Sequence, residues 1–352
     1  MLRFIKRDEV SKGKSTTIRI SSVILALLVF SIVFILMKKN PLDIYASMLN
    51  GAFGSSYSIR ETIKLAIPLC IAALGVAVAF KMHFWNIGAE GQILMGAFLA
   101  SVFALKFPGM PRPALLIIMM IAGIIGGSFW ALIPAVFKAK WGTNETIVTL
   151  MMNYVAIKWI VFLQHGPLKD PNAKGFAKIA NFTDNAILPE IFKVHIGWIF
   201  ALVLVIFIFI FMKYTKTGYE ISVLGESEKT ALYSGVNIKK TIIISILLSG
   251  GLCGLVGMIQ ASGISNTLVE SVSGGVGYTA IIVAWLGYLS APVILVVSIL
   301  FAALQQGGSF IQTSYGIPGA TALILQSMIL FFVLGSEFFI RFKISKKVGD
   351  AK

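Results

Sequence analysis

Long apolar runs separated by short polar segments dominate the pattern of this chain. Charged residues, glycine and proline mark the ends of ten such runs. A helix needs about 20 apolar residues to cross the hydrocarbon core of a bilayer, and most of the runs approach that length. The pattern therefore predicts about ten transmembrane helices, at residues 20–37, 62–80, 88–106, 114–137, 145–163, 196–212, 241–261, 276–289, 291–307 and 319–340.

The composition agrees with this pattern. Hydrophobic residues make up 57% of the chain and charged residues 13%, and the mean hydropathy is +0.88. A soluble domain typically has about 45–50% apolar and about 25% charged residues. We therefore predict an all-α polytopic membrane protein with a transmembrane domain at residues 20–340.

The net charge of +15 could point to a nucleic-acid partner, but the basic residues lie at the ends of the apolar runs. With the N-terminus inside, the inner segments hold 19 basic residues and the outer segments hold ten. Cytoplasmic loops of membrane proteins carry such an excess of lysine and arginine. The charge pattern thus favours topology over nucleic-acid binding, and it predicts cytoplasmic segments at 1–19 and 341–352.

Polar residues interrupt the chain at Phe80–Gly96, where an apolar run of membrane length breaks open. Asn86, Glu90 and Gln92 lie in this stretch, and the apolar part that follows is about one turn short of a full crossing. Non-helical backbone at membrane depth is tolerated only where protein packs around it or where it lines a wet cavity. The stretch is thus a candidate re-entrant segment or broken helix in a translocation pathway. The alternative is a solvated turn near the headgroups, with Glu90 in water.

Two further spans carry polar groups that should face protein or water rather than lipid: Asn153 in the run 145–163 and Gln305 at the end of the run 291–307. We group them with Asn86, Glu90 and Gln92 as candidate pathway residues. The run 241–261 instead carries Gly250, Gly254 and Gly257 at helical spacing. Such a face of small residues predicts close helix packing.

The two longest loops differ in what they predict. The outer loop 164–195 is polar and contains three prolines, so it could form a small extracytoplasmic cap, a lateral helix or a simple linker. The inner loop 213–240 contains a predicted short helix at 226–234, with Ser227 as N-cap and Gly235 as its C-terminal stop. This helix could contact a soluble motor, or it could be a surface helix without a partner.

Several patterns that suggest chemistry do not hold. Gly13-Lys14-Ser15-Thr16 resembles the end of a P-loop, but Asp8 stands where the leading glycine is required, so we predict that the chain does not bind ATP itself. Its three histidines have no metal-ligand spacing, and no nucleophile and base can be paired. We predict no catalytic residues and no metal site.

The stretch Phe84-Trp85-Asn86-Ile87-Gly88-Ala89-Glu90-Gly91-Gln92 resembles the NIGxEGQ element of permease subunits of bacterial ABC importers. These belong to the branched-chain amino acid permease superfamily, and the chain is most similar to its nucleoside and simple-sugar branch. The resemblance covers most of residues 40–340. It continues at 144–147, 153–154, 218–237, 248–251 and 277–287.

The resemblance implies a permease in the bacterial cytoplasmic (inner) membrane that pairs with a second permease, either homologous or identical. It also implies an extracytoplasmic substrate-binding protein and separate ATP-binding cassette subunits that hold ATP and Mg²⁺. Spans two to five and seven to ten would be inverted repeats. The helix in the inner loop would be the coupling helix, with contacts to the ATPase from Glu226, Ser227, Glu228, Lys229, Thr230, Ala231 and Ser234.

The chain departs from the family pattern at two positions. Ser222 stands where the family usually has an arginine, and Trp285 lies in a run that is normally aliphatic. We predict a permease for nucleosides, in particular purine nucleosides. The alternatives are a permease for a monosaccharide such as ribose or galactose, and a stand-alone channel or ion-coupled carrier that uses Glu90.

Overall fold

Helices account for nearly all regular structure in the described part of the protein. The computed structural model describes residues 2–6, 12–171, 173, 175 and 177–346. The chain forms two units, one of residues Ile63–Ala302 and one of Met1–Thr62 with Ala303–Lys352. We describe each unit by itself.

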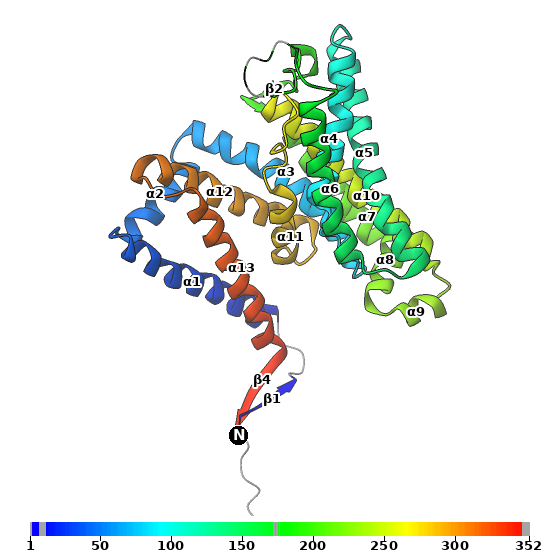
Figure 1. The fold of residues 1–352 in the computed structure, drawn as a ribbon. Coiled ribbons are helices and arrows are strands. Elements are labelled where there is room, and N and C mark those ends of the chain that lie inside the picture. Colours follow the sequence, from blue (N-terminus) through cyan, green and yellow to red (C-terminus); the bar gives the residue numbers. More distant parts are fainter. Residues whose placement is uncertain (1, 7–11, 172, 174, 176, 347–352) are drawn as a thin grey trace, which may run out of the picture. The chain divides into compact units, whose positions relative to one another are not determined.

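The helices follow one another along the chain as shown in Figure 1: α1 (Lys12–Leu36), α2 (Pro41–Phe53), α3 (Ser56–Lys81), α4 (Ala89–Lys106), α5 (Arg112–Trp141), α6 (Glu145–His165), α7 (Gly197–Tyr214), α8 (Lys216–Glu226), α9 (Glu228–Tyr233), α10 (Ile238–Gln260), α11 (Val276–Leu286), α12 (Ala291–Tyr315) and α13 (Ala320–Arg341). A 3₁₀ turn η1 (Asp184–Ala186) and a π-helical turn η2 (Ala261–Ser265) lie between them. The strands are β1 (Leu2–Lys6), β2 (Glu190–Ile191), β3 (Val194–His195) and β4 (Phe342–Lys346).

The predicted all-α membrane architecture is confirmed. Eight helices in the described ranges are long and apolar enough to cross a membrane, and each coincides with a predicted span. The run at 276–289 is different, because α11 has only 11 residues and is too short to cross. Left-handed backbone at Gly274 and Gly275 precedes α11, and left-handed Tyr288 and Leu289 follow it. The prediction of one membrane-length helix there was wrong, but the segment 266–286 as a whole runs from the cap, where Asn266 accepts the Phe182 amide, to the end of α3, where Trp285 stacks on Trp85.

Helices α4, α5 and α10 pack against one another in the unit Ile63–Ala302 (Figure 1). The glycine face of α10 permits this packing, as predicted. A side chain at Gly254 would collide with the backbone of Gly123 and Gly127 on α5. Small residues let transmembrane helices approach until their backbones touch, which increases dispersion contacts where lipid supplies no hydrophobic drive.

The outer loop is a folded cap rather than a linker or a lateral helix. It contains η1 and the β2–β3 hairpin, and its own residues Ile179, Phe182 and Leu188 are buried. The Arg112 guanidinium at the start of α5 donates two hydrogen bonds to the Ile187 carbonyl, at 3.0 and 2.8 Å. The Ser262 hydroxyl in η2 donates to the Ala186 carbonyl. The cap is therefore fixed to the start of α5 and to η2.

The inner loop contains two helices rather than one. Ser227 separates α8 from α9, and its hydroxyl accepts the Thr230 amide at 3.3 Å, so the predicted N-cap is confirmed. Glu226, which the sequence placed in the same helix, instead ends α8. The helix α8 itself was not predicted. Only two of its residues, Gly218 and Ile221, are buried, and its apolar pattern is weak.

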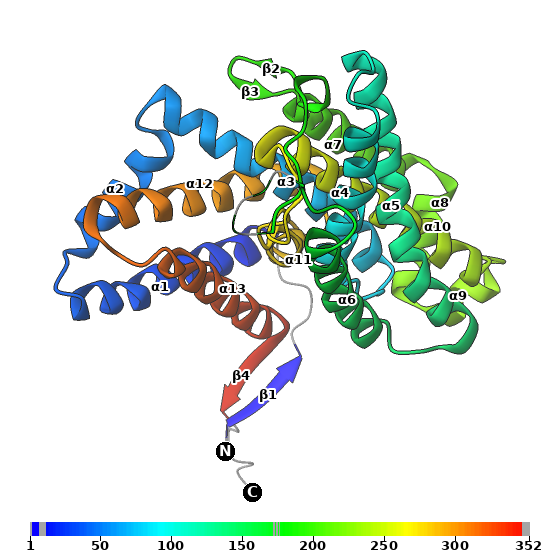
Figure 2. The ribbon, with the colours of Figure 1, turned by 45° about the horizontal axis from the view of Figure 1, so that its top comes forward.

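The second unit contains α1, α2 and α13 together with the ends of α3 and α12. Helix α1 packs against α13, and β1 pairs antiparallel with β4, so Leu2 lies opposite Lys346 (Figure 2). The sequence did not predict α2, although Asn40 as N-cap and Pro41 in the first turn are typical start signals.

Candidate functional site

Residues 82–88 form a break in the apolar core, between the end of α3 and the start of α4. His83 has left-handed backbone with φ of 59°, which turns the chain out of α3. Met82 and Phe84 are buried, with 6% and 2% of their surfaces exposed. Asn86 and Gly88 are also buried, whereas His83 and Trp85 are exposed, so protein packs against one side of this non-helical segment.

Two side-chain amides close the break from within. The Asn86 Nδ2 donates to the Gln92 Oε1 at 3.2 Å, and the Gln92 Nε2 donates to the Asn86 Oδ1 at 3.0 Å. Asn86 also donates to the Ser249 hydroxyl on α10 at 3.1 Å. Both amides are buried, so the pair is not exchanged for water. Its effect is to hold the start of α4 and the break against α10.

Asn153 on α6 supports the same break from outside. Its Oδ1 accepts the Gly91 amide at 2.8 Å, and its Nδ2 donates to the Ile87 carbonyl at 2.9 Å. These two backbone groups lie on either side of the helix start and would otherwise lack partners. Asn153 is fully buried, so it serves as a structural clamp in this conformation.

Glu90 connects the break to a second one. Its Oε1 accepts the Gly275 amide at 3.1 Å, and its Oε2 accepts the Gly277 amide at 2.8 Å. These amides begin α11, whose own N-cap residue Gly275 has no side chain to cap it. Glu90 therefore caps α11 from α4, where the positive end of the helix dipole favours it. Only 5% of its surface is exposed, so the alternative of a solvated turn is wrong.

The starts of α4 and α11 approach each other very closely at this point. A Cβ atom on Gly277 would collide with the backbone nitrogen and Cα of Glu90. Two interrupted helices thus meet end to end in the core. The sequence identified the break before α4 and missed the one before α11, although the Gly274-Gly275 pair was its signal.

Gln305 is the one candidate pathway residue outside this group. It lies on α12 in the second unit, where its carbonyl accepts the Ser309 hydroxyl at 3.2 Å. Its grouping with Asn86, Glu90, Gln92 and Asn153 stays a prediction.

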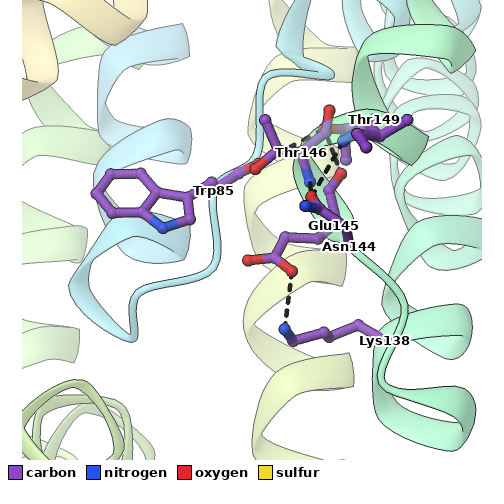
Figure 3. Close-up of polar contacts among 7 residues, drawn as sticks. Trp85, Lys138, Asn144, Glu145, Thr146 and Thr149 are labelled. Carbon is purple, nitrogen blue, oxygen red and sulfur yellow. Dashed lines mark hydrogen bonds and ion pairs between the residues drawn. The ribbon is translucent and has the colours of Figure 1, made fainter.

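The start of α6 also supports the break (Figure 3). The Thr149 hydroxyl accepts the Ile87 amide at 3.3 Å, and it lies 3.5 Å from the Trp85 carbonyl. Lys138 at the end of α5 and Glu145 at the start of α6 form an ion pair of 2.8 Å. Asn144 caps α6 by accepting the Thr146 amide at 3.0 Å. The start of α6 is thus fixed to the break through Thr149 and to the end of α5 through Glu145.

Aromatic rings join the same two interrupted helices. Trp85 in the break stacks on Trp285 near the end of α11, with ring centroids 5.6 Å apart and an interplanar angle of 16°. His83 stacks on Trp85 at 6.3 Å. Trp285, one of the departures from the family pattern, therefore has a defined partner. This contact was not predicted, because neither tryptophan carries a sequence signal for the other.

The helix α9 projects from this unit. Val236 donates to the Ala231 carbonyl and Gly235 to the Leu232 carbonyl, both at 3.0 Å, with left-handed Gly235 at φ of 72°. This pair of hydrogen bonds is the pattern of a Schellman C-cap. Tyr233 is 94% exposed and Leu232 is 61% exposed. Next to α9, Gly225 on α8 packs directly against the Lys81 carbonyl, where the break begins.

Comparison with known proteins decides which family this arrangement belongs to. A model of the family described as branched-chain amino acid transport system / permease component matches residues 58–334. The chain belongs to this permease family. The resemblance seen in the sequence is thereby confirmed, and the permease is a multi-pass membrane transport subunit rather than an enzyme.

Individual relatives align with the permease over nearly its whole length. The glucose ABC transporter permease protein TsgB13 of Haloferax volcanii is 32% identical, covering 92% of this chain and 88% of the relative. The nucleoside ABC transporter permease protein NupB of Lactococcus lactis is 30% identical, covering 92% of both. The guanosine ABC transporter permease protein NupP of Bacillus subtilis is 29% identical, covering 92% and 94%.

Proposed function

We propose that this permease is the transmembrane subunit of an ATP-driven importer that carries nucleosides, in particular purine nucleosides, into the cell. The observation that carries the proposal is the physical link between α9 and the break. A capped, projecting helix is joined through α8 to the backbone of Lys81, where α3 ends. Such a link is what a soluble motor needs to act on interrupted helices in the membrane.

In this proposal the ATPase binds the surface around α9 formed by Glu226, Ser227, Glu228, Lys229, Thr230 and Ser234, whereas the predicted contact Ala231 has no exposed surface. Ala231 is buried and supports the helix from below, whereas the exposed Leu232 and Tyr233 supply apolar contact area. A displacement of α9 would pass through α8 to the break, and from there to the starts of α4 and α11.

The candidate pathway residues have a supporting role in this mechanism. Asn86, Gln92 and Asn153 hold the break, and Glu90 holds the start of α11. Helix ends that meet in the core offer backbone groups to a polar substrate when they separate, which is a general arrangement for alternating access. Gln305 would line the pathway from α12. The meeting of two breaks also supports the predicted inverted repeat of α3–α6 and α10–α13.

The proposed orientation places both termini, α8 and α9 in the cytoplasm and the cap outside. Residues 1–19 and 341–352 are then cytoplasmic segments flanking the transmembrane domain at 20–340. The extracytoplasmic substrate-binding protein would dock on the cap, and a second permease would complete the pathway. ATP and Mg²⁺ would bind to separate cassette subunits.

The cargo has a second candidate. The similarity to a glucose permease, at 32% identity, favours a monosaccharide. Two relatives at 30% and 29% identity carry names for nucleoside and guanosine transport, and they favour the nucleoside. A nucleoside also has a planar base that aromatic side chains can stack on.

Transport in proteoliposomes tests the proposal. The permease is reconstituted with its partner ATPase, the second permease and the binding protein. Uptake of radiolabelled guanosine is then compared with uptake of ribose, galactose and glucose. We expect guanosine uptake, and we expect it to require ATP on the side of the membrane where the ATPase lies. Uptake of sugars alone would support the second cargo, whereas uptake driven by an ion gradient without ATP would support a carrier and contradict the proposal.

A further inference from the structure

An apolar crevice of about 320 Å³ lies among α3, α7, α12 and the β2–β3 hairpin. Its volume is at the lower end of the range for small-molecule pockets, about 300–1,000 Å³. Hydrocarbon side chains form nearly all of its lining, including Ala66, Trp198, Leu202 and Ile299. All of these residues belong to the unit Ile63–Ala302.

The walls of the crevice place it next to the bilayer. Helices α3, α7 and α12 are long and apolar enough to cross a membrane, and only 22% of the apolar window of α7 is buried in the protein. Leu202 and Ile299 line the crevice and are still 42% and 38% exposed. An apolar wall offers water no hydrogen bonds. At this depth the surrounding solvent is lipid hydrocarbon, which matches the lining.

The hairpin beside the crevice presents an aromatic ring and a cation. Phe192 and Lys193 form its tip, and both have left-handed backbone, with φ of 57° and 63°. Two-residue hairpins with this geometry normally use asparagine and glycine, so the turn is strained. Phe192 lines the crevice although 83% of it is exposed. A strained turn at this position fits a role for its side chains.

Charges of both signs lie near the crevice, because Glu61 precedes the lining residue Ile63 by two positions. Lys193 lies directly after Phe192, and Lys64 directly after the lining residue Ile63. Glu190 in β2 is the acid on the hairpin. Lysine heads at the end of an apolar site attract anionic lipid headgroups.

We propose that this crevice binds one acyl chain of an anionic membrane phospholipid, with Lys193 contacting its phosphate. The acyl chain then fills the space under the hairpin, between α7 and α3. The bound lipid joins the hairpin to the transmembrane helices from the lipid side.

Native mass spectrometry of the purified full chain tests this with dioleoyl phosphatidylglycerol and dioleoyl phosphatidylcholine as probes. Leu202→Trp fills the crevice, and Val203→Trp on the same helix is the matched control, because Val203 is 57% exposed and does not line it. We expect the wild type and Val203→Trp to retain about threefold more phosphatidylglycerol than phosphatidylcholine. Leu202→Trp should lose this excess. Equal retention in both variants would overturn the proposal.

The charge contribution is tested separately. Lys193→Ala should reduce the preference for phosphatidylglycerol over phosphatidylcholine at least about twofold. Lys178→Ala, an exposed lysine in the same extracytoplasmic segment, should leave it unchanged. An unchanged preference in Lys193→Ala would remove the proposed headgroup contact.

A fluorescence measurement keeps the proposal testable if Leu202→Trp does not fold. Trp198 is kept as the sole tryptophan, and quenching by phospholipids with brominated acyl chains is recorded in nanodiscs. Brominated phosphatidylglycerol should quench Trp198 more strongly than brominated phosphatidylcholine at equal mole fraction. Equal quenching by the two lipids overturns the proposal, as does absence of quenching by either lipid.

Discussion

Glu90 is the residue on which the arrangement of the two interrupted helices depends most directly. Its two carboxyl oxygens accept separate backbone amides of Gly275 and Gly277, at 3.1 and 2.8 Å. A helix normally satisfies its first amides with a residue of its own. Here the cap comes from another helix, so α4 and α11 cannot separate without leaving buried donors unpaired.

Glu90→Gln should destabilise the protein and reduce transport. A glutamine keeps one accepting oxygen but turns an NH₂ group toward the second amide, so one hydrogen bond is lost at a buried position. The cost is about 1–3 kcal/mol. Thermal unfolding in detergent and substrate uptake in proteoliposomes measure the two effects. Glu190→Gln, an exposed acid in β2, is the control and should change stability by less than about 0.5 kcal/mol. Unchanged stability in Glu90→Gln would mean that the cap does not hold α11.

His195 makes the stability of the protein depend on pH. Burial, and then the positive charge of Lys64, lowers the pKa of His195 from 6.5 to about 4. Its ring is 1% exposed, and neither ring nitrogen has a hydrogen-bond partner in the described structure. The folded state therefore binds fewer protons than the unfolded state between these pH values, so stability rises with pH across this window.

We expect a loss of about 2 kcal/mol of stability from His195 between pH 7 and pH 5, as the unfolded histidine protonates and the buried one does not. His195→Leu removes the titrating group, so its stability should fall less over the same interval. Thermal unfolding at pH 5, 6, 7 and 8 in one detergent gives the comparison. Parallel pH profiles for the two proteins would contradict the assignment.

The site residues could be predicted singly, but their partners could not. Asn86, Glu90 and Gln92 stood out because polar groups in an apolar run need protein or water around them. Glu90 bonds to backbone amides of glycines, which have no side chains to reveal a partner 185 and 187 residues away. The stacking of Trp85 on Trp285 depends on the same meeting of helices, and no local pattern encodes it.

At the scale of elements, the single residue Ser227 joins α8 to α9, and α8 contacts the end of α3. The Gly225 backbone lies against the Lys81 carbonyl, which leaves no room for a side chain at that position. Capping at both ends keeps the six-residue α9 helical, although so short a helix is unstable alone. Force applied to α9 would therefore reach the end of α3 without being absorbed by a flexible loop.

Tyr233→Ala should lower ATP-driven uptake at least about tenfold and leave stability unchanged. The side chain is 94% exposed, so its removal costs no packing within the permease. At an interface, loss of an aromatic anchor costs about 2 kcal/mol or more. Uptake and thermal unfolding are measured together, with Tyr57→Ala as the control because Tyr57 is 64% exposed at the start of α3. Wild-type uptake in Tyr233→Ala would exclude α9 as the main motor contact.

Elements with strong local signals were predictable, and those defined by tertiary context were not. The eight long spans follow from run length, and α9 follows from Ser227 and Gly235. The short α11 resembled a span because its apolar run continues into the left-handed turn at Tyr288 and Leu289, where hydropathy alone gives no stop.

On the scale of the whole molecule, the two breaks give the unit Ile63–Ala302 an internal correspondence. A long helix, an interruption and a new helix occur in α3–α4 and again in α10–α11. The two new helices begin at the same place in the core, where Glu90 joins them. If the two halves run in opposite directions through the membrane, the cap and α9 must lie on opposite sides.

The opposite placement of the cap and α9 can be tested by cysteine labelling. Phe192→Cys on the cap and Tyr233→Cys on α9 create thiols at positions that are 83% and 94% exposed. The native Cys70 and Cys253 are buried and serve as an internal blank. In intact cells, a membrane-impermeant maleimide should label Phe192→Cys, whereas Tyr233→Cys should react only after permeabilisation. Labelling of Tyr233→Cys in intact cells would reverse the orientation and place α9 out of reach of a cytoplasmic ATPase.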